Sequence, residues 1–178
     1  MNAEGNDKIK TWLCVNAHAF NGKHIPSPSE QPRRGAVAAI LRWRTSYTVV
    51  ENKAKTIEEF FQQDWVINDP KGQAEILFMQ RATRVGDRWS GHVAFPGGKN
   101  EELETDEETC KREVLEEIGL DLNSDDFIQV GKLDEREVFS VATKKLLMML
   151  IPFVYLQVAP ETPPFKLQES EVAAVQCE

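Results

Sequence analysis

The sequence predicts an α/β or α+β domain, because several apolar segments of strand length flank one strongly marked helix. Its 178 residues hold one ordinary domain with an appended arm, and a second full-sized domain has no room. We expect an N-terminal arm over residues 1–32 and the folded domain over 33–178. No internal repeat interrupts this order.

Besides this helix, the sequence predicts four strands and one short helix. Gly35–Trp43 is a nearly continuous apolar run bounded by turn signals, which suits a strand covered on both faces. Thr56–Trp65 predicts a short helix, with Thr56 as its N-cap and Glu59 as the capping-box partner. Three further segments read as strands: Glu75–Arg81, Phe127–Leu133 and Lys144–Tyr155.

The strongest helix signal lies between the second and third predicted strands and covers about 106–118. Thr105 can cap its first turn with Glu108 reciprocating, and Gly119 supplies the left-handed position that ends a helix. Helical spacing predicts a buried stripe formed by Cys110, Val114, Leu115 and Ile118.

Three carboxylates, those of Glu113, Glu116 and Glu117, share one face of this helix. Like charges four residues apart cost about 0.2–0.5 kcal/mol per pair on an exposed helix, and Arg112 relieves only part of this repulsion through pairs with Glu116 and Glu108. A solvated charged surface is the ordinary interpretation of such a run. A metal site is the alternative, because Gly98 and the glycine before it let the backbone approach an ion closely.

Charge changes sign abruptly in this region. Residues 71–99 hold five basic and two acidic side chains, whereas residues 101–117 hold nine acidic and two basic ones. Oxygen-rich clusters of this kind suit Mg²⁺ or Mn²⁺, which complete their shells with water and substrate phosphate oxygens. With Arg81, Arg84 and Arg88 nearby to hold phosphates, the pattern favours metal-assisted attack of water on a phosphate linkage.

Composition narrows the classes of partner and compartment. The formal charge of −8 and pI near 5.0 argue against bulk electrostatic binding to long nucleic acid or anionic membrane. Cys14, Cys110 and Cys177 are odd in number and widely spaced, which favours a reducing compartment. Without a spanning apolar run or a secretory signal, we expect an intracellular protein, cytoplasmic by default, with mitochondrial or peroxisomal targeting left open.

The segment from Gly98 to Leu120 resembles the box of the Nudix family, which specifies nine positions over 23 residues. Every spacing is kept here, by Gly98, Glu104, Arg112, Glu113, Val114, Glu116, Glu117, Gly119 and Leu120. The resemblance implies the Nudix fold, an α/β/α sandwich around a mixed β-sheet, with the box forming a loop, a helix and a second loop that bind a divalent metal. It also implies hydrolysis of nucleoside diphosphates linked to another moiety.

Carried over residue by residue, Glu113, Glu116 and Glu117 resemble the metal ligands, together with the backbone carbonyl of Gly98. Arg112 resembles the residue that orients these carboxylates, and Glu104 and Gly119 resemble structural positions of the box. The general base varies in the family. Glu113 or Glu116 is a candidate, as is a distal acid among Glu135, Glu137 and Glu171.

Segments upstream of the box, 77–82 and 91–98, are similar to those of coenzyme A pyrophosphatase-like members, although Asp87 stands where that branch has a second arginine. The resemblance implies a small-molecule substrate such as coenzyme A. ADP-ribose, nucleotide sugars and nucleoside triphosphates stay open, and so does a Nudix-fold module that binds RNA or protein without cleavage. Those relatives continue into a final strand and helix, so we expect that this chain, ending at Glu178, is truncated; its oligomeric state is undetermined.

Two other patterns, a possible zinc site and the four tryptophans, give weaker indications of function. Cys14, His18 and His24 lack the fourth ligand and the paired spacing of a zinc site, so packing roles are expected. The four tryptophans are scattered, which predicts core or interface positions instead of a base-stacking platform.

Overall fold

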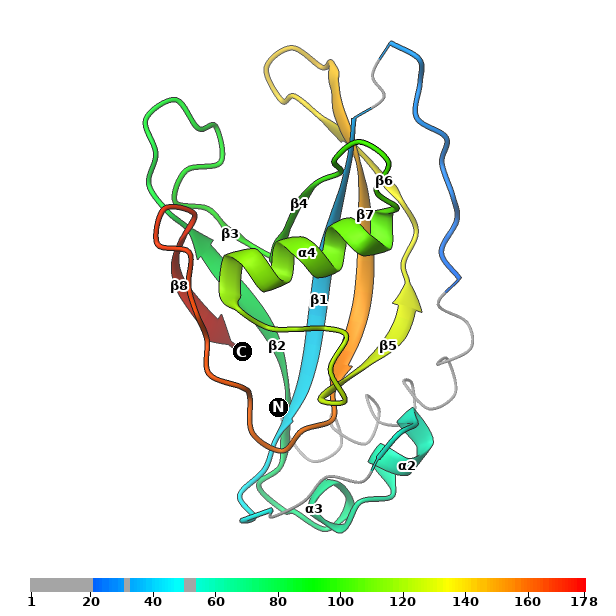
Figure 1. Cartoon of the computed structure of the whole chain (residues 1–178), viewed down its shortest axis with the longest axis vertical. Helices are drawn as coiled ribbons and strands as arrows, with labels where there is room; N and C mark the ends of the chain where they lie inside the picture. Colours follow the sequence, from blue (N-terminus) through cyan, green and yellow to red (C-terminus); the bar gives the residue numbers. More distant parts are fainter. Residues whose placement is uncertain (1–20, 31–32, 50–53) are drawn as a thin grey trace.

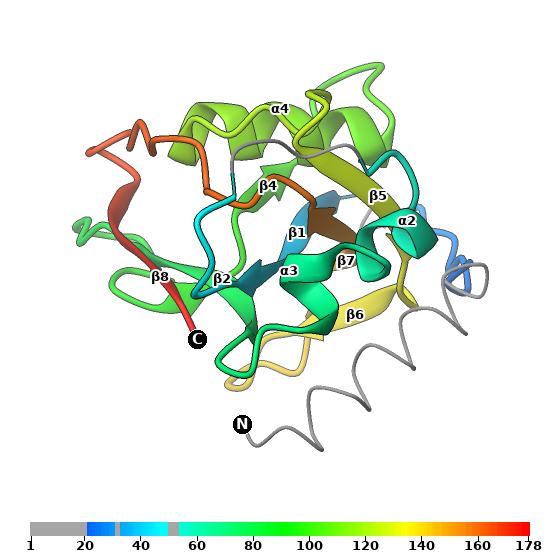
Figure 2. The ribbon, with the colours of Figure 1, turned by 90° about the horizontal axis from the view of Figure 1, so that it is seen from below.

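The computed structural model describes residues 21–30, 33–49 and 54–178, and over these residues eight strands form one mixed sheet. The long helix α4 (Asp106–Ile118) crosses one face of the sheet, and the short helices α2 (Ile57–Phe61) and α3 (Asp64–Ile67) lie on the other (Figures 1 and 2). The predicted sandwich of helices around a mixed sheet is confirmed.

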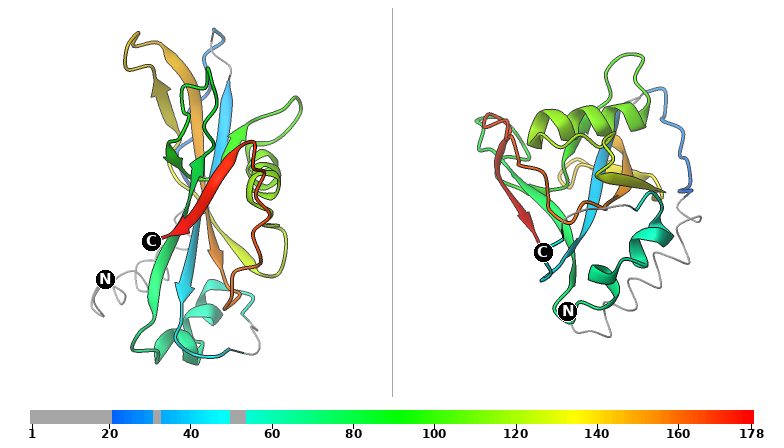
Figure 3. Two further views of the ribbon diagram at one scale, coloured as in Figure 1. Left: turned by 90° about the vertical axis from the view of Figure 1, so that its left-hand side faces the viewer. Right: turned by 60° about the horizontal axis from the view of Figure 1, so that its bottom comes forward.

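Two long strands, β1 (Arg34–Arg44) and β7 (Leu146–Gln157), run parallel at the centre of the sheet, and every other pairing between the strands of the described residues is antiparallel. The remaining strands are β2 (Gln73–Arg81), β3 (Val93–Ala94), β4 (Gly97–Lys99), β5 (Phe127–Lys132), β6 (Arg136–Phe139) and β8 (Val172–Cys177). The left view of Figure 3 shows the strands nearly edge-on with α4 to one side.

β1 changes its neighbour along its length. Residues 41–44 pair with the start of β2, whereas residues 35–37 pair with β4. The far end of β2 pairs instead with β3 and β8. The sheet therefore divides beside β4, and this division positions the site described below.

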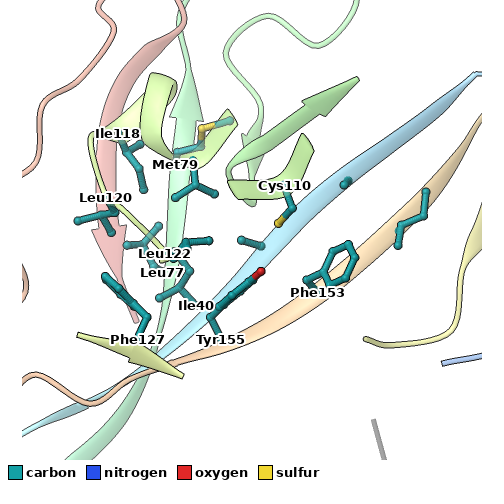
Figure 4. Packing of buried hydrophobic residues seen from close by; sticks show 14 of the residues in the cluster. Ile40, Leu77, Met79, Cys110, Ile118, Leu120, Leu122, Phe127, Phe153 and Tyr155 are labelled. Atoms are coloured by element: carbon teal, nitrogen blue, oxygen red, sulfur yellow. The ribbon is translucent and has the colours of Figure 1, made fainter. Parts of the chain in front are cut away.

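The core consists of two layers, one on each face of the sheet. Because strand side chains alternate, Ala36, Ala38 and Ile40 of β1 face α4, while Ala39 and Trp43 face α2 and α3. In the layer under α4, Cys110 and Ile118 of the helix pack above strand residues and above the segment that follows the helix (Figure 4). Other members of this layer are Leu77, Met79, Leu120, Leu122, Phe127, Phe153 and Tyr155.

All four predicted strands form, but the helix predicted over 56–65 is wrong in its continuity. Thr56 caps α2 by accepting from the Glu59 N–H at 3.1 Å, while the Glu59 carboxylate accepts from Lys55. The helix then breaks at 62–63 before α3. Phe60 and Trp65 pack edge to face at 5.4 Å in the same cluster, and in one unbroken helix residues five apart would diverge by about 140°.

The predicted α4 is confirmed at both ends. The Thr105–Glu108 capping box is complete, and Gly119 adopts φ +77°. The predicted buried stripe is wrong at Leu115, which is 50% exposed, because the face that meets the sheet runs through Cys110, Val114 and Glu117.

Part of the predicted N-terminal arm lies within the described residues. The Gly22 N–H donates to the Lys132 carbonyl at 2.9 Å, and the Ile25 N–H donates to Glu135 at 2.9 Å. Residues 21–25 therefore lie along the β5–β6 connection. The zinc candidates Cys14 and His18 lie outside the described residues, so that alternative is untested.

Candidate functional site

A cleft of about 710 Å³ opens where the sheet divides. β4 forms one wall, and the end of β2 with β3 and their connecting loop forms the other. Glu113 and Glu117 reach it from α4, and Val37, Met148 and Leu150 line its apolar side. Those three residues lie on the sheet face away from α4, so the cleft joins an anionic region to an apolar one.

Two glycines of β4 admit the carboxylates to the cleft. A Cβ on Gly98 would collide with the Glu113 carboxylate, so that carboxylate lies against bare backbone. Gly97, at φ +145°, donates its N–H to Glu117 Oε2 at 2.8 Å, and a Cβ there would collide with the Ala36 carbonyl of β1. The Gly98 carbonyl oxygen lies beside β1, 3.0 Å from the place of a Cβ on Gly35. Gly98 has no side chain, which leaves room for the Glu113 carboxylate, and its carbonyl stays a predicted metal ligand.

The fold disfavours negative charge on both carboxylates. Glu117 is only 2% exposed, and burial raises its pKa to about 7 despite the hydrogen bond from Gly97. Burial also raises the pKa of Glu113, although Arg112 opposes the shift. The charge of Glu171 raises both pKa values further. These are carboxylates whose charged form a cation would stabilise.

Arg112 holds the acidic cluster together. Its Nε donates to Glu104 Oε1 at 2.6 Å and its Nη2 to Glu104 Oε2 at 3.0 Å, a bidentate pair that lowers the pKa of Glu104 to about 2. Its Nη1 lies 3.1 Å from Glu113 and 3.0 Å from Glu116. The expected pair with Glu108 does not form, because Glu108 closes the capping box.

The three predicted metal-ligating carboxylates do not converge equally. Glu113 and Glu117 line the cleft, whereas the half-exposed Glu116 side chain turns toward Arg112. Within the described ranges no three His, Cys, Asp or Glu side chains form a metal-holding group by themselves. Two carboxylates still fit Mg²⁺ or Mn²⁺, which take one or two protein carboxylates and fill their shells with water and phosphate oxygens.

The structure separates the three predicted phosphate-binding arginines. Arg81 and Arg84 line the cleft, and Arg88 is exposed outside it. Arg81 pairs with Asp87 at 3.1 Å, and Arg84 pairs with Glu171 at 3.0 Å. The acid at position 87, where the similar branch has arginine, thus holds a cleft arginine in place.

The candidate distal bases also differ in position. Glu135 is buried and bound by four donors, and Glu137 lies on β6; neither lines the cleft. Glu171 does line it. Of the three distal acids, Glu171 alone faces Glu113 and Glu117.

Sequence reasoning missed the contribution of Trp89. Trp43 and Trp65 are buried as expected, but Trp89 is 41% exposed and lines the cleft with His92. The sequence does contain one indication: Trp89 follows Arg84 and Arg88 and precedes the box that starts at Gly98. Hydropathy alone does not distinguish a tryptophan at the edge of a cleft from one in the core.

Comparison with known proteins agrees with this arrangement. The NUDIX domain family matches residues 64–177. An uncharacterized protein of Schizosaccharomyces pombe is 36% identical over 152 residues, which are 84% of this chain and 42% of that protein. The chain thus spans less than half the length of this curated relative.

Solved structures share the fold. A Caenorhabditis elegans Ap4A hydrolase complex is 13% identical with a TM-score of 0.50, covering 81% of this chain and 77% of that one. A MutT/nudix family protein from Enterococcus faecalis is 14% identical with a TM-score of 0.52, covering 96% of this chain and 54% of that one.

No helix in the described part of the chain is long and apolar enough to cross a membrane.

Proposed function

Because the chain belongs to the NUDIX domain family, we propose that it hydrolyses the pyrophosphate linkage of a nucleoside diphosphate derivative with Mg²⁺ or Mn²⁺. The observation that carries this proposal is the pair Glu113 and Glu117, held behind side-chain-free backbone at the mouth of a cleft that also contains two arginines. Every acid of the box is present.

The charged residues in and beside the cleft have distinct tasks in this proposal. Glu113 and Glu117 would hold the cation, which when bound neutralises phosphate charge and lowers the pKa of its water. Arg112 keeps Glu113 oriented and neutralises the half-exposed Glu116. Arg81 and Arg84 bind the diphosphate oxygens through charge-assisted hydrogen bonds. Glu171, which lines the cleft, takes the proton of the attacking water in this proposal.

For the substrate we propose coenzyme A or a related compound. Support comes from the segments upstream of the box, which contribute Arg81, His92 and Phe95 to the cleft. The apolar side formed by Val37, Met148 and Leu150 suits the non-nucleotide part of such a substrate. An intracellular location remains a prediction from the three scattered cysteines.

The test is a screen of coenzyme A, ADP-ribose, nucleotide sugars and nucleoside triphosphates with Mg²⁺ or Mn²⁺, with products identified by mass. Glu113→Gln should lower turnover by at least about a hundredfold, because one cation ligand loses its charge. Glu107→Gln is the matched control on the same helix, outside the cleft and paired with Lys111.

Hydrolysis that persists after exhaustive chelation would contradict the metal assignment. Cleavage of every other diphosphate faster than coenzyme A would contradict the substrate assignment alone. Tight ligand binding without turnover would favour the alternative, a non-catalytic binding module.

A further inference from the structure

We infer that Trp89 forms an aromatic platform on which the purine base of the substrate stacks while Arg81 and Arg84 bind its phosphates. This inference rests on the proposed function and adds the part of the substrate that the cleft recognises outside the diphosphate. It concerns one rim of the cleft, formed by the β2–β3 loop over residues 82–92, which projects at the upper left in Figure 1.

The position of Trp89 is unusual for its residue type. Trp43 and Trp65 are each 5% exposed in the core, whereas Trp89 is 41% exposed and lines the cleft. Among the residues that the structure describes, its ring has one aromatic neighbour, the His92 ring, edge to face at 6.0 Å. An indole with this exposure beside a cleft leaves a face available for an aromatic ligand.

The loop holds the backbone of Trp89 in a defined place, and the His92 ring lies beside the indole. The backbone N–H of Trp89 donates to Asp87 Oδ1 at 2.9 Å, and the backbone N–H of Arg84 donates to Ser90 Oγ at 2.8 Å. Asp87 itself is paired with Arg81. A loop backbone that is ordered before binding lowers the conformational entropy lost when the ligand arrives.

The charges around Trp89 select the chemical class of the ligand. Arg81 is the last residue of β2, Arg84 lies near the start of the loop that carries Trp89, and both line the same cleft. A cleft of about 710 Å³ has the size of a small-molecule site. An aromatic ring that carries phosphates matches both features, whereas a bare inorganic diphosphate uses only the arginines.

The experiment compares two non-hydrolysable probes by titration calorimetry in Mg²⁺: α,β-methylene-ADP, which has a base, and methylenediphosphonate, which has none. Stacking on an aromatic side chain contributes about 1–3 kcal/mol per base, which is about a fivefold to hundredfold change in affinity. Trp89→Ala should lower the affinity for α,β-methylene-ADP by this factor and leave the affinity for methylenediphosphonate within twofold of wild type. Trp89→Phe should restore most of the affinity.

Val85→Ala is the matched control, since Val85 is a fully exposed apolar residue of the same loop that does not line the cleft. It should bind both probes like wild type. In wild type, α,β-methylene-ADP should quench tryptophan fluorescence, and this quenching should be lost in Trp89→Phe. Equal affinity of wild type and Trp89→Ala for α,β-methylene-ADP would overturn the inference.

Failure of the proposed function gives a different result. In that case wild type cleaves none of the screened diphosphates, yet the base-dependent loss of affinity in Trp89→Ala still occurs and supports the platform. If wild type cleaves diphosphates and Trp89→Ala binds both probes normally, only the platform is refuted.

Discussion

Glu117 shows how a single residue couples stability to function. Its carboxyl is nearly fully buried, and its pKa of about 7 means that ionisation is disfavoured in the folded chain. Because the folded state binds the proton more tightly than the unfolded state, this residue lowers stability as pH rises from about 4.5 to about 7. A charge retained at such a cost is typical of a functional position.

Glu117→Gln should therefore stabilise the metal-free protein at pH 8, by about 2–3 kcal/mol, and have little effect at pH 4.5. Glutamine keeps an oxygen that accepts the Gly97 N–H. Urea unfolding of both proteins in a chelator, at a series of pH values, measures the difference. A constant difference from pH 4.5 to pH 8 would show that the carboxyl titrates normally.

At the scale of elements, β4 is a three-residue strand whose two glycines have different tasks. The neighbour of a Cβ on Gly98 is the end of the Glu113 side chain, which can move. The neighbour of a Cβ on Gly97 is the backbone of β1, which cannot, and its φ of +145° disfavours any side chain.

Gly98→Ala should therefore displace the Glu113 carboxylate and lower hydrolysis by about a hundredfold, with a melting temperature within a few degrees of wild type. Gly97→Ala should instead lower the free energy of unfolding by about 3 kcal/mol or more. Thermal melts paired with activity assays separate the two effects. Full activity in Gly98→Ala would contradict a role for β4 in positioning the Glu113 carboxylate.

Over the whole molecule, one buried acid joins segments that are distant in the sequence. Glu135 is 1% exposed, and although burial opposes ionisation, donors from Ile25, His24, Lys132 and Arg34 lower its pKa to about 2. Arg34 also binds Asp106 in the first turn of α4 at 2.7 Å. This cluster connects the N-terminal segment, β1, the β5–β6 connection and the box helix.

Glu135→Gln should destabilise the protein by about 3 kcal/mol at pH 7, because it leaves the partly buried cations Arg34 and Lys132 without their counter-charge. Glu137→Gln, two residues away and exposed on β6, is the control and should change stability by less than about 0.5 kcal/mol. Denaturant unfolding measures both. Similar losses in the two variants would indicate that the cluster adds no stability.

Local chemistry was sufficient to predict the helix of the box and its neighbours. The ends of α4 follow from Thr105, Glu108 and Gly119, whose capping interactions span only a few residues. The apolar runs that become β1 and β7 are long and uniform, so their strand character does not depend on what surrounds them. The spacing of the box acids likewise places three carboxylates on one helix face before any tertiary contact exists.

Tertiary structure decided which of those groups share the cleft. The orientation of α4 on the sheet buries Glu117 and leaves Leu115 and Glu116 exposed. Helical spacing alone does not determine which of these neighbouring residues is buried. The site also needs the division of the sheet beside β4, and the return of β8 that brings Glu171 to the cleft, since both are contacts between segments far apart in the chain. Trp89 stands on the rim for the same reason: a residue's exposure depends on which distant segments pack around it, and no local pattern records them.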